Sequence, residues 1–234
     1  MKNITMTIFI FILIAISGCS ERNEIESIYR ETESLEARIY DCAEDIARYK
    51  ENCEAILKAY PRSEFADDAL YKLGMLNELF GHYKDAVAYY EKLWMHFPEH
   101  EMSASAIYRS AVIYHDHLED TNKAAELYLQ VGRRYPKSAL AAEALISLGQ
   151  IAGRREKWAE AVGYYKEFLG KFPEHPSCDA LRFRTADIYQ YQLKRPAEAR
   201  KMYENPIESQ PGSAWATQAE LRLRQITEGG GSDE

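Results

Sequence analysis

Residues 61–98 read PRSEFADDALYKLGMLNELFGHYKDAVAYYEKLWMHFP, and the punctuation of this stretch returns along the rest of the chain. Prolines stand at positions 61, 98, 136, 173 and 211, so the steps between them are 37, 38, 37 and 38 residues. A period in this range, without glycine-rich or strand-like content, is typical of a helical solenoid. Each unit is therefore predicted to be a helical hairpin.

Small residues and tyrosines recur at fixed places within the units. A small residue follows each of the first four prolines by thirteen positions, an alanine precedes each closing proline by twelve, and a tyrosine precedes it by eight. These three sets are Gly74, Ala111, Gly149 and Ala186; Ala86, Ala124, Ala161 and Ala199; and Tyr90, Tyr128, Tyr165 and Tyr203. Antiparallel helices approach closely only where side chains are small, so these positions are the predicted crossing points. The proline ends the second helix, because the residue before a proline is pushed out of the α region.

The order of small residue, alanine, tyrosine and proline resembles the tetratricopeptide repeat. Each unit is about three residues longer than the 34 of that family, and units two and four carry one extra residue between their helices. The resemblance implies an all-α fold, a right-handed superhelical solenoid of antiparallel helix pairs. The longer link Pro-x-Ser-x-x-Ala, at Pro61 and Pro136, resembles the variant found in bacterial envelope proteins. These include the BamD lipoproteins of the β-barrel assembly machinery and the repeat protein that coordinates the Tol–Pal system.

The pattern divides the chain into segments with different expected roles. A signal peptide is expected at 1–18, a tether at 19–24 and a heptad-patterned helix at 25–60; the four repeats are 61–97, 98–135, 136–172 and 173–210, a capping helix ends at 227, and 228–234 is a tail. The tail is glycine-rich and acidic, and is predicted to be disordered.

Residues 25–60 carry apolar or small residues at alternating steps of three and four, without glycine or proline. This seam predicts one long or gently broken helix whose second half, from about Ala43, packs on the first full unit. The alternative is a degenerate first hairpin, with Ala37 at the small position and Cys53 in place of the tyrosine. The same seam would also allow oligomerisation through 25–60.

The first residues resemble a lipoprotein signal. Lys2 precedes an apolar run over 4–16 that is too short to span a bilayer comfortably, and Ile16-Ser17-Gly18-Cys19 follows. This tetrapeptide resembles the bacterial lipobox, which implies that Cys19 is lipidated and attaches the protein to a membrane. An ordinary secretory signal, or a retained short anchor, is the alternative. Residues 20 and 21 lack the aspartate that commonly follows the lipidated cysteine of inner-membrane lipoproteins. We therefore expect the periplasmic face of the outer membrane in a cell with two membranes.

Composition and motifs argue against several function classes. The net charge is -8, and removal of residues 1–18 removes only Lys2, which gives -9. An acidic chain without a basic stripe does not indicate nucleic-acid binding. We find no phosphate loop, nucleophile elbow or zinc signature, so neither an enzyme nor a cofactor is expected. No metal site is expected either, because His115 and His117 stand two residues apart on a helix and point in different directions.

Three cysteines remain besides Cys19. Cys42 and Cys53 are eleven residues apart, roughly 16 Å along a helix, so they cannot bond to each other while that helix is intact. Cys178 occupies a small-residue position that other units fill with alanine or serine. We interpret these residues as buried free thiols, although the sequence leaves open whether Cys42, Cys53 or Cys178 form disulfides.

The first helices of the repeats are expected to line a concave surface that binds partners. The expected contact positions are Tyr71, Met75, Tyr108, Val112, Ile146, Gln150, Phe183 and Asp187. A column of large apolar groups on a solvent face marks a protein-binding surface. The alternative is that these residues pack against the adjacent unit, because aromatic stripes at helical spacing are often core.

The resemblance implies a scaffold that binds other envelope proteins or their peptide segments. The leading interpretation is a BamD-like lipoprotein of outer-membrane assembly. BamD-like proteins usually begin their repeats close behind the lipidated cysteine, whereas the seam from Ile25 resembles the coiled-coil-plus-repeat plan of the Tol–Pal-associated coordinator. Such a coordinator of the envelope and of division is therefore one alternative. A cell-wall turnover enzyme, or its activator, is an alternative of another class.

Overall fold

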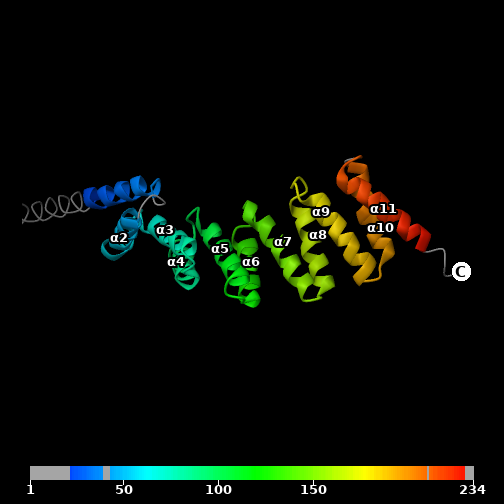
Figure 1. Ribbon diagram of the computed structural model, residues 1–234, viewed down its shortest axis with the longest axis horizontal. Coiled ribbons are helices and arrows are strands. Elements are labelled where there is room, and N and C mark those ends of the chain that lie inside the picture. The colour runs from blue at the N-terminus through cyan, green and yellow to red at the C-terminus, as the bar shows by residue number, and fades with distance from the viewer. Residues whose placement is uncertain (1–21, 39–42, 210, 230–234) are drawn as a thin grey trace, which may run out of the picture. The chain divides into compact units, whose positions relative to one another are not determined.

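The structure is a computed structural model that describes residues 22–38, 43–209 and 211–229. In these ranges all the regular elements are helices (Figure 1). After a helix over 22–36 they are α2 (Ala43–Ala59), α3 (Ala66–Leu79), α4 (Tyr83–His96), α5 (Ser103–Asp116), α6 (Thr121–Arg134), α7 (Ala139–Arg154), α8 (Trp158–Lys171), α9 (Cys178–Asp187), the π-helix η1 (Ile188–Gln192), α10 (Pro196–Ser209) and α11 (Ala214–Gly229). The expected all-α, tetratricopeptide-like fold is confirmed.

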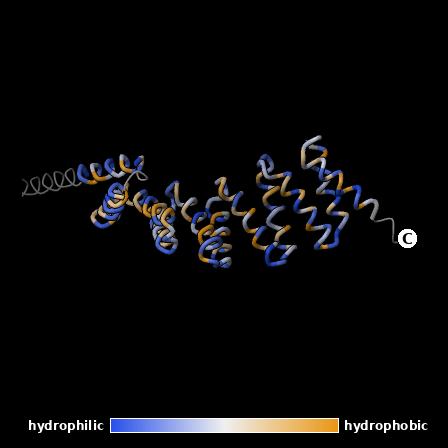
Figure 2. The backbone as a smooth tube through the Cα atoms, in the orientation of Figure 1, coloured by the Kyte–Doolittle hydropathy of each residue, from blue (hydrophilic) through white to orange (hydrophobic). Residues whose placement is uncertain are grey.

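The chain forms two units, and the boundary between them falls within α5, after Ile113. In the first unit α2 packs on α3 and α3 on α4, and in the second each helix from α6 to α11 packs on the next. Hydrophobic residues recur along every helix (Figure 2), as expected where each hairpin buries its faces on its neighbours. Among the described residues, no helix is both long and apolar enough to span a membrane.

The predicted crossing points are confirmed by the packing of the glycines. A Cβ atom added at Gly74 would lie 2.4 Å from Cε1 of Tyr90, and one added at Gly149 would lie 2.2 Å from Cε1 of Tyr165. Both rings are buried. The tyrosine of the second helix therefore occupies the space that the missing side chain leaves on the first.

The prolines end the second helices as predicted. Phe97, Tyr135 and Phe172, which stand directly before prolines, have φ near -129° and ψ between 54° and 60°, outside the helical region. Each of the three still donates its N–H to the carbonyl four residues back. The helix therefore keeps its last hydrogen bond and then changes direction, as the steric restriction before proline requires.

The extra residue of the second and fourth repeats enters the turn between their two helices. In every repeat a backbone N–H at the start of the second helix donates to a carbonyl near the end of the first helix. The pairs are His82 to Asn77 (2.8 Å), Asp120 to Tyr114 (2.8 Å), Lys157 to Ala152 (2.9 Å) and Arg195 to Tyr189 (2.8 Å). The hydrogen bond thus spans five residues in the first and third repeats and six residues in the second and fourth. In the fourth repeat the π-helix η1 takes up the insertion, because one π turn holds one residue more than an α turn.

The single helix expected over 25–60 is wrong. The first helix ends at residue 36, and α2 begins at Ala43. Side-chain contacts show that the two run antiparallel, because residues early in one meet residues late in the other. The contacts are Glu24 with Tyr60, Glu31 with Arg48, and Arg38 with Asp45.

This first hairpin buries much of the described part of the heptad seam inside its own unit. Ile25 and Leu35 join Tyr49 and Cys53 in one core with residues of α3. A straight helix would have left half of these apolar groups in water, and this loss is avoided when the chain folds back. The seam residues that are buried here are not available for oligomerisation through 25–60.

Two of the cysteines are buried free thiols, as expected: Cys53 and Cys178. Burial raises the pKa of the Cys53 thiol to about 12. Cys178 donates from Sγ to the carbonyl oxygen of Phe172 at 3.1 Å, as Ser103 does from Oγ to Phe97 at 2.7 Å. Cys42 lies outside the described residues.

Candidate functional site

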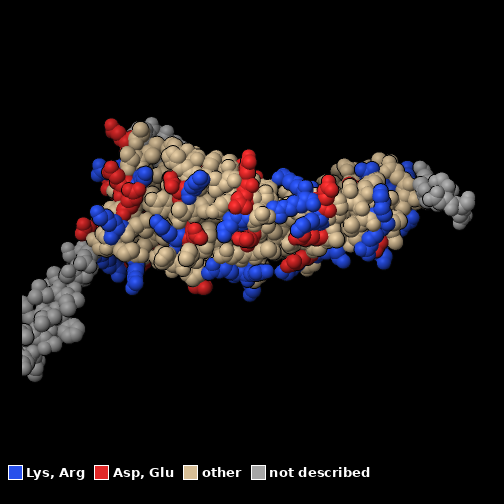
Figure 3. All heavy atoms as spheres, turned by 90° about the horizontal axis from the view of Figure 1, so that it is seen from below, with Lys and Arg blue, Asp and Glu red and all other residues tan. Residues whose placement is uncertain are grey.

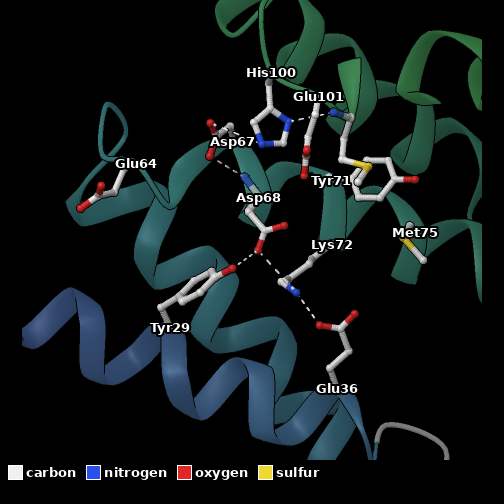
Figure 4. Close-up of a pocket in the computed structure, with 11 residues that line it drawn as sticks. Tyr29, Glu36, Glu64, Asp67, Asp68, Tyr71, Lys72, Met75, His100 and Glu101 are labelled. Carbon is white, nitrogen blue, oxygen red and sulfur yellow. Dashed lines mark hydrogen bonds and ion pairs between the residues drawn. The ribbon is translucent and has the colours of Figure 1, made fainter. Parts of the chain in front are cut away.

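A cavity of about 350 Å³ opens in the first unit (Figure 4). It lies between the helix of residues 22–36, α3 and the segment that leads into α5. Its wall includes Tyr71 and Met75, which are two of the predicted contact residues. The first helices of consecutive hairpins therefore do form a hollow surface in this unit.

One wall of the cavity is a chain of polar contacts centred on Asp68. Tyr29 donates its hydroxyl to Oδ2 of Asp68 at 2.6 Å, and Nζ of Lys72 lies 3.4 Å from the same oxygen and also binds Glu36. Burial disfavours the charge of Lys72, but the two carboxylates outweigh it and raise the pKa of the lysine. Burial and the bond to Asp68 raise the pKa of the Tyr29 hydroxyl. These groups satisfy one another and form a fixed wall.

A histidine closes the cavity from the side of α5. Nε2 of His100 lies 3.6 Å from Oδ2 of Asp67, and Nδ1 accepts the backbone N–H of Met102 at 3.2 Å. His175 repeats this arrangement in the second unit, at 3.5 Å from Glu143 and 3.2 Å from the N–H of Ser177. Neither histidine was singled out from the sequence. The repeated tetrapeptide Phe-Pro-Glu-His at 97–100 and 172–175 was the signal for them.

Carboxylates outnumber cations around the cavity. The five acids that line it are Glu36, Glu64, Asp67, Asp68 and Glu101, against one lysine, Lys72. Glu64 also meets Arg22, at 3.1 Å, but at an exposed site where such a pair contributes little. Glu101 is exposed on the segment before α5. The cavity therefore presents an excess of negative charge.

Apolar side chains continue from the cavity along α3. Tyr71, Met75 and Leu79 follow one another at steps of four, so they share one face of the helix. Met75 is 39% exposed and Leu79 is 52% exposed. Tyr71 is half-buried, with its hydroxyl 3.0 Å from Oγ of Ser105. Tyr71 therefore belongs partly to the packing, whereas Met75 faces solvent as predicted.

The other predicted contact residues divide between partly buried and packed positions. Tyr108 and Val112 are partly buried on α5, and Ile146 and Gln150 are partly buried on α7. None of these four lines the cavity of the first unit. Cys19 lies outside the described residues.

Phe183 and Asp187 do not lie on an open groove, so the prediction is wrong for them. Phe183 is only 9% exposed, and its ring centroid lies 5.4 Å from that of Tyr203 and 5.7 Å from that of Trp215. Asp187 accepts the hydroxyl of Tyr203 and lies 3.5 Å from Arg222. The reason is the end of the array, where α11 packs on α9 and covers this face. The packing alternative holds at these two positions.

The remaining polar candidates show no ligand geometry. Nε2 of His115 lies 2.8 Å from Nη1 of Arg154. Among the described residues, no group of three or more His, Cys, Asp or Glu side chains could hold a metal ion. On the face shown in Figure 3, acidic and basic side chains are interspersed.

Comparisons with known proteins agree with this architecture. Sequence models described as tetratricopeptide repeat match residues 68–100, 111–176 and 146–214, together more than half of the chain. No curated protein matches the sequence.

Solved structures show the same fold at low identity. A structure of MamA AMB-1 superposes with a TM-score of 0.56 at 17% identity, covering 87% of this chain and 98% of the other. YrrB, described as a TPR protein with an unusual peptide-binding site, superposes with a TM-score of 0.53 at 17% identity, covering 81% of this chain and 88% of its own. With the matched repeats and the glycine–tyrosine crossings at the predicted spacing, the chain belongs to the tetratricopeptide repeat family.

Proposed function

We propose that the protein is a scaffold that binds other proteins or their peptide segments. The binding surface is the cavity together with the exposed apolar face of α3 that carries Met75 and Leu79, which we call the α3 groove. The observation that carries this proposal is the exposure of Met75 and Leu79 beside the acidic cavity. Large apolar side chains on a concave, solvent-facing surface are typical of protein-binding sites. The description of YrrB as a peptide-binding protein of the same fold supports it. An enzyme is not expected, because neither a sequence motif nor a side-chain cluster among the described residues suggests catalysis.

We further propose that this scaffold is lipid-anchored through Cys19 at the periplasmic face of the outer membrane and acts in envelope assembly in a BamD-like way. The support is the lipobox resemblance together with the first hairpin. The seam over 25–60 resembled a coiled coil, and this difference from BamD-like proteins favoured a Tol–Pal-associated coordinator. The hairpin begins by residue 22, close behind Cys19, and so resembles the BamD-like plan instead. The coordinator remains the second candidate.

A site-specific crosslink tests the binding function. A photo-crosslinking amino acid would replace Met75 in the groove or, as the matched control, Met95, which is 66% exposed on α4. Crosslinked partners are then captured from cells through a C-terminal tag. We expect adducts at position 75 that position 95 does not give. Barrel-assembly proteins in these adducts support the BamD-like role, and Tol–Pal proteins support the alternative. Identical adducts at the two positions would rule out the groove, and muralytic activity of the purified chain would favour the enzyme class.

A substitution at the lipid site tests the anchor. Cys19→Ser is expected to leave an unprocessed or soluble protein, because acyl chains supply the membrane affinity at about 0.8 kcal/mol per buried CH₂. Detergent partitioning and mass spectrometry of the mature N-terminus measure this. A Cys19→Ser protein that is cleaved yet still fractionates with membranes would disprove the assignment. Cys178→Ser serves as the control, because Ser103 makes the same hydrogen bond at the equivalent position of another repeat.

A further inference from the structure

The chain contains an internal comparison for the groove. Residues 61–100 align with 136–175 without a gap, at an offset of 75. The framework positions are the same in both: Gly74 and Gly149, Tyr90 and Tyr165, His100 and His175. The two stretches therefore build the same kind of hairpin, so their surface residues can be compared position by position.

The two stretches differ at many positions, and those on the exposed face of α3 change in chemical type. Asp67, Tyr71, Met75, Leu79 and Glu101 correspond at this offset to Ala142, Ile146, Gln150, Arg154 and Pro176. The exposed apolar residues Leu79 and Phe80 thus stand where the third repeat has Arg154 and Arg155. Arginine is the ordinary choice for a solvated helix end. Leu79 and Phe80 therefore leave apolar surface exposed at this end of α3, next to Met75.

The groove has two chemically different ends. Acidic side chains lie at the N-terminal end of α3, with Asp67 and Glu101, and apolar side chains lie at the C-terminal end, with Met75 and Leu79. From Asp67 to Leu79 the helix rises about 18 Å. An extended peptide covers that length with about five or six residues.

We propose that this groove binds a segment of a partner protein that carries a lysine or arginine at one end and a large apolar residue about five positions away. The inference rests on the proposed scaffold function and adds the chemical class of the ligand. Charge complementarity selects a cation for the acidic end. There Lys72 is already bound to Asp68 and Glu36, and Asp67 lies beside His100, so the exposed Glu101 is the carboxylate left to the ligand. The apolar end excludes a purely basic ligand, because Met75 and Leu79 would then stay in water.

Defined peptides test this directly on the full-length chain in detergent. The probe is a fluorescein-labelled decapeptide with two arginines at one end, Leu-Phe near the other and Gly-Ser between, made in both chain directions. One control replaces the arginines with glutamates, and the other replaces Leu-Phe with Ala-Ala. By fluorescence anisotropy we expect the arginine–apolar probe to bind at least about ten-fold more tightly than either control. Its binding should weaken between about 50 mM and about 500 mM NaCl, because salt screens exposed charges.

Matched variants of the protein assign the binding to the two ends. Met75→Ala is expected to weaken the probe about five-fold or more, and Glu101→Gln about three-fold. Met95→Ala and Glu91→Gln remove the same groups from exposed positions on α4 and should change nothing. Thermal melts confirm that the four variants are folded.

Several results would overturn the proposal. Equal affinity for the arginine and glutamate peptides would remove the charge requirement, and probe binding unaffected by Met75→Ala would remove the site. A lower mass of Met75→Ala in sedimentation would mean that a second copy covers the groove instead. If no probe binds while the crosslinker at position 75 still captures envelope proteins, the ligand class is wrong and the scaffold function stands. If the probe binds as expected while the crosslinker captures nothing, the scaffold function in the envelope fails.

Discussion

Gly149→Leu is expected to lower the free energy of unfolding by about 3 kcal/mol or more. A Cβ atom added at this position would lie 2.2 Å from Cε1 of Tyr165. The tyrosine is only 1% exposed, so its ring has no open space to move into. A leucine would therefore force α7 and α8 apart. Denaturant titration followed by circular dichroism measures the loss.

The control lies in the same hairpin. Gly163 is exposed in the middle of α8, and nothing lies within 4 Å of a Cβ added there. Gly163→Leu should raise the stability by about 0.5 to 1 kcal/mol, because leucine is a better helix former than glycine. The two substitutions are chemically identical, so opposite signs isolate the effect of the crossing. Equal effects would show that the helices do not cross at Gly149.

Alkaline pH is expected to unfold the first unit in a steep transition. Burial raises the pKa of the hydroxyls of Tyr49 and Tyr90, and raises the pKa of the Cys53 thiol to about 12. Each group is neutral below its unfolded-state pKa, where its contribution to stability is complete. As the pH rises, the unfolded chain loses protons that the folded chain retains, so stability falls from about pH 9 for the thiol and about pH 10 for the tyrosines. Each group contributes up to about 1.4 kcal/mol per pH unit, or about 4 kcal/mol per unit for the three together.

Denaturant titrations between neutral pH and about pH 11 measure this slope. Tyr49→Phe is the matched variant, since it removes one titrating proton and leaves the ring in the core. The pH slope of its stability should be smaller by the contribution of one group. The tyrosinate absorbance that Tyr49→Phe removes should appear in the parent protein only together with unfolding. If the folded parent shows this absorbance difference near pH 10, the burial of Tyr49 is contradicted.

The fold could be predicted because its information is local. The contact of Gly74 with Tyr90 joins residues sixteen apart within one hairpin, so their spacing alone fixed the crossing. The ends of α4, α6 and α8 were equally accessible, since a proline acts on the residue directly before it. The extra residue of the second and fourth repeats was visible in the sequence too. The sequence did not show how the backbone accommodates this residue, which is by a longer turn in the second repeat and by a π-helix in the fourth.

The first hairpin was only the alternative prediction, because a heptad pattern does not reveal a reversal of direction. Apolar residues at steps of three and four fit one long helix and two antiparallel helices equally well. The choice depends on what the seam can bury against, and here α3 offers Ala69, Leu73 and Leu76 to both helices at once. Tertiary packing therefore decided the topology of residues 22–59.

The candidate site shows the same division. From the repeat spacing alone, the sequence determined that Tyr71, Met75 and Phe183 occupy equivalent or adjacent positions on first helices. Only the tertiary structure decided that Met75 is exposed beside an acidic cavity while Phe183 is covered by α11. It also brought Tyr29, Asp68 and Lys72 together. The physical reason is that a helix position fixes the direction of a side chain, whereas its burial depends on the next element, which lies many residues away in the chain.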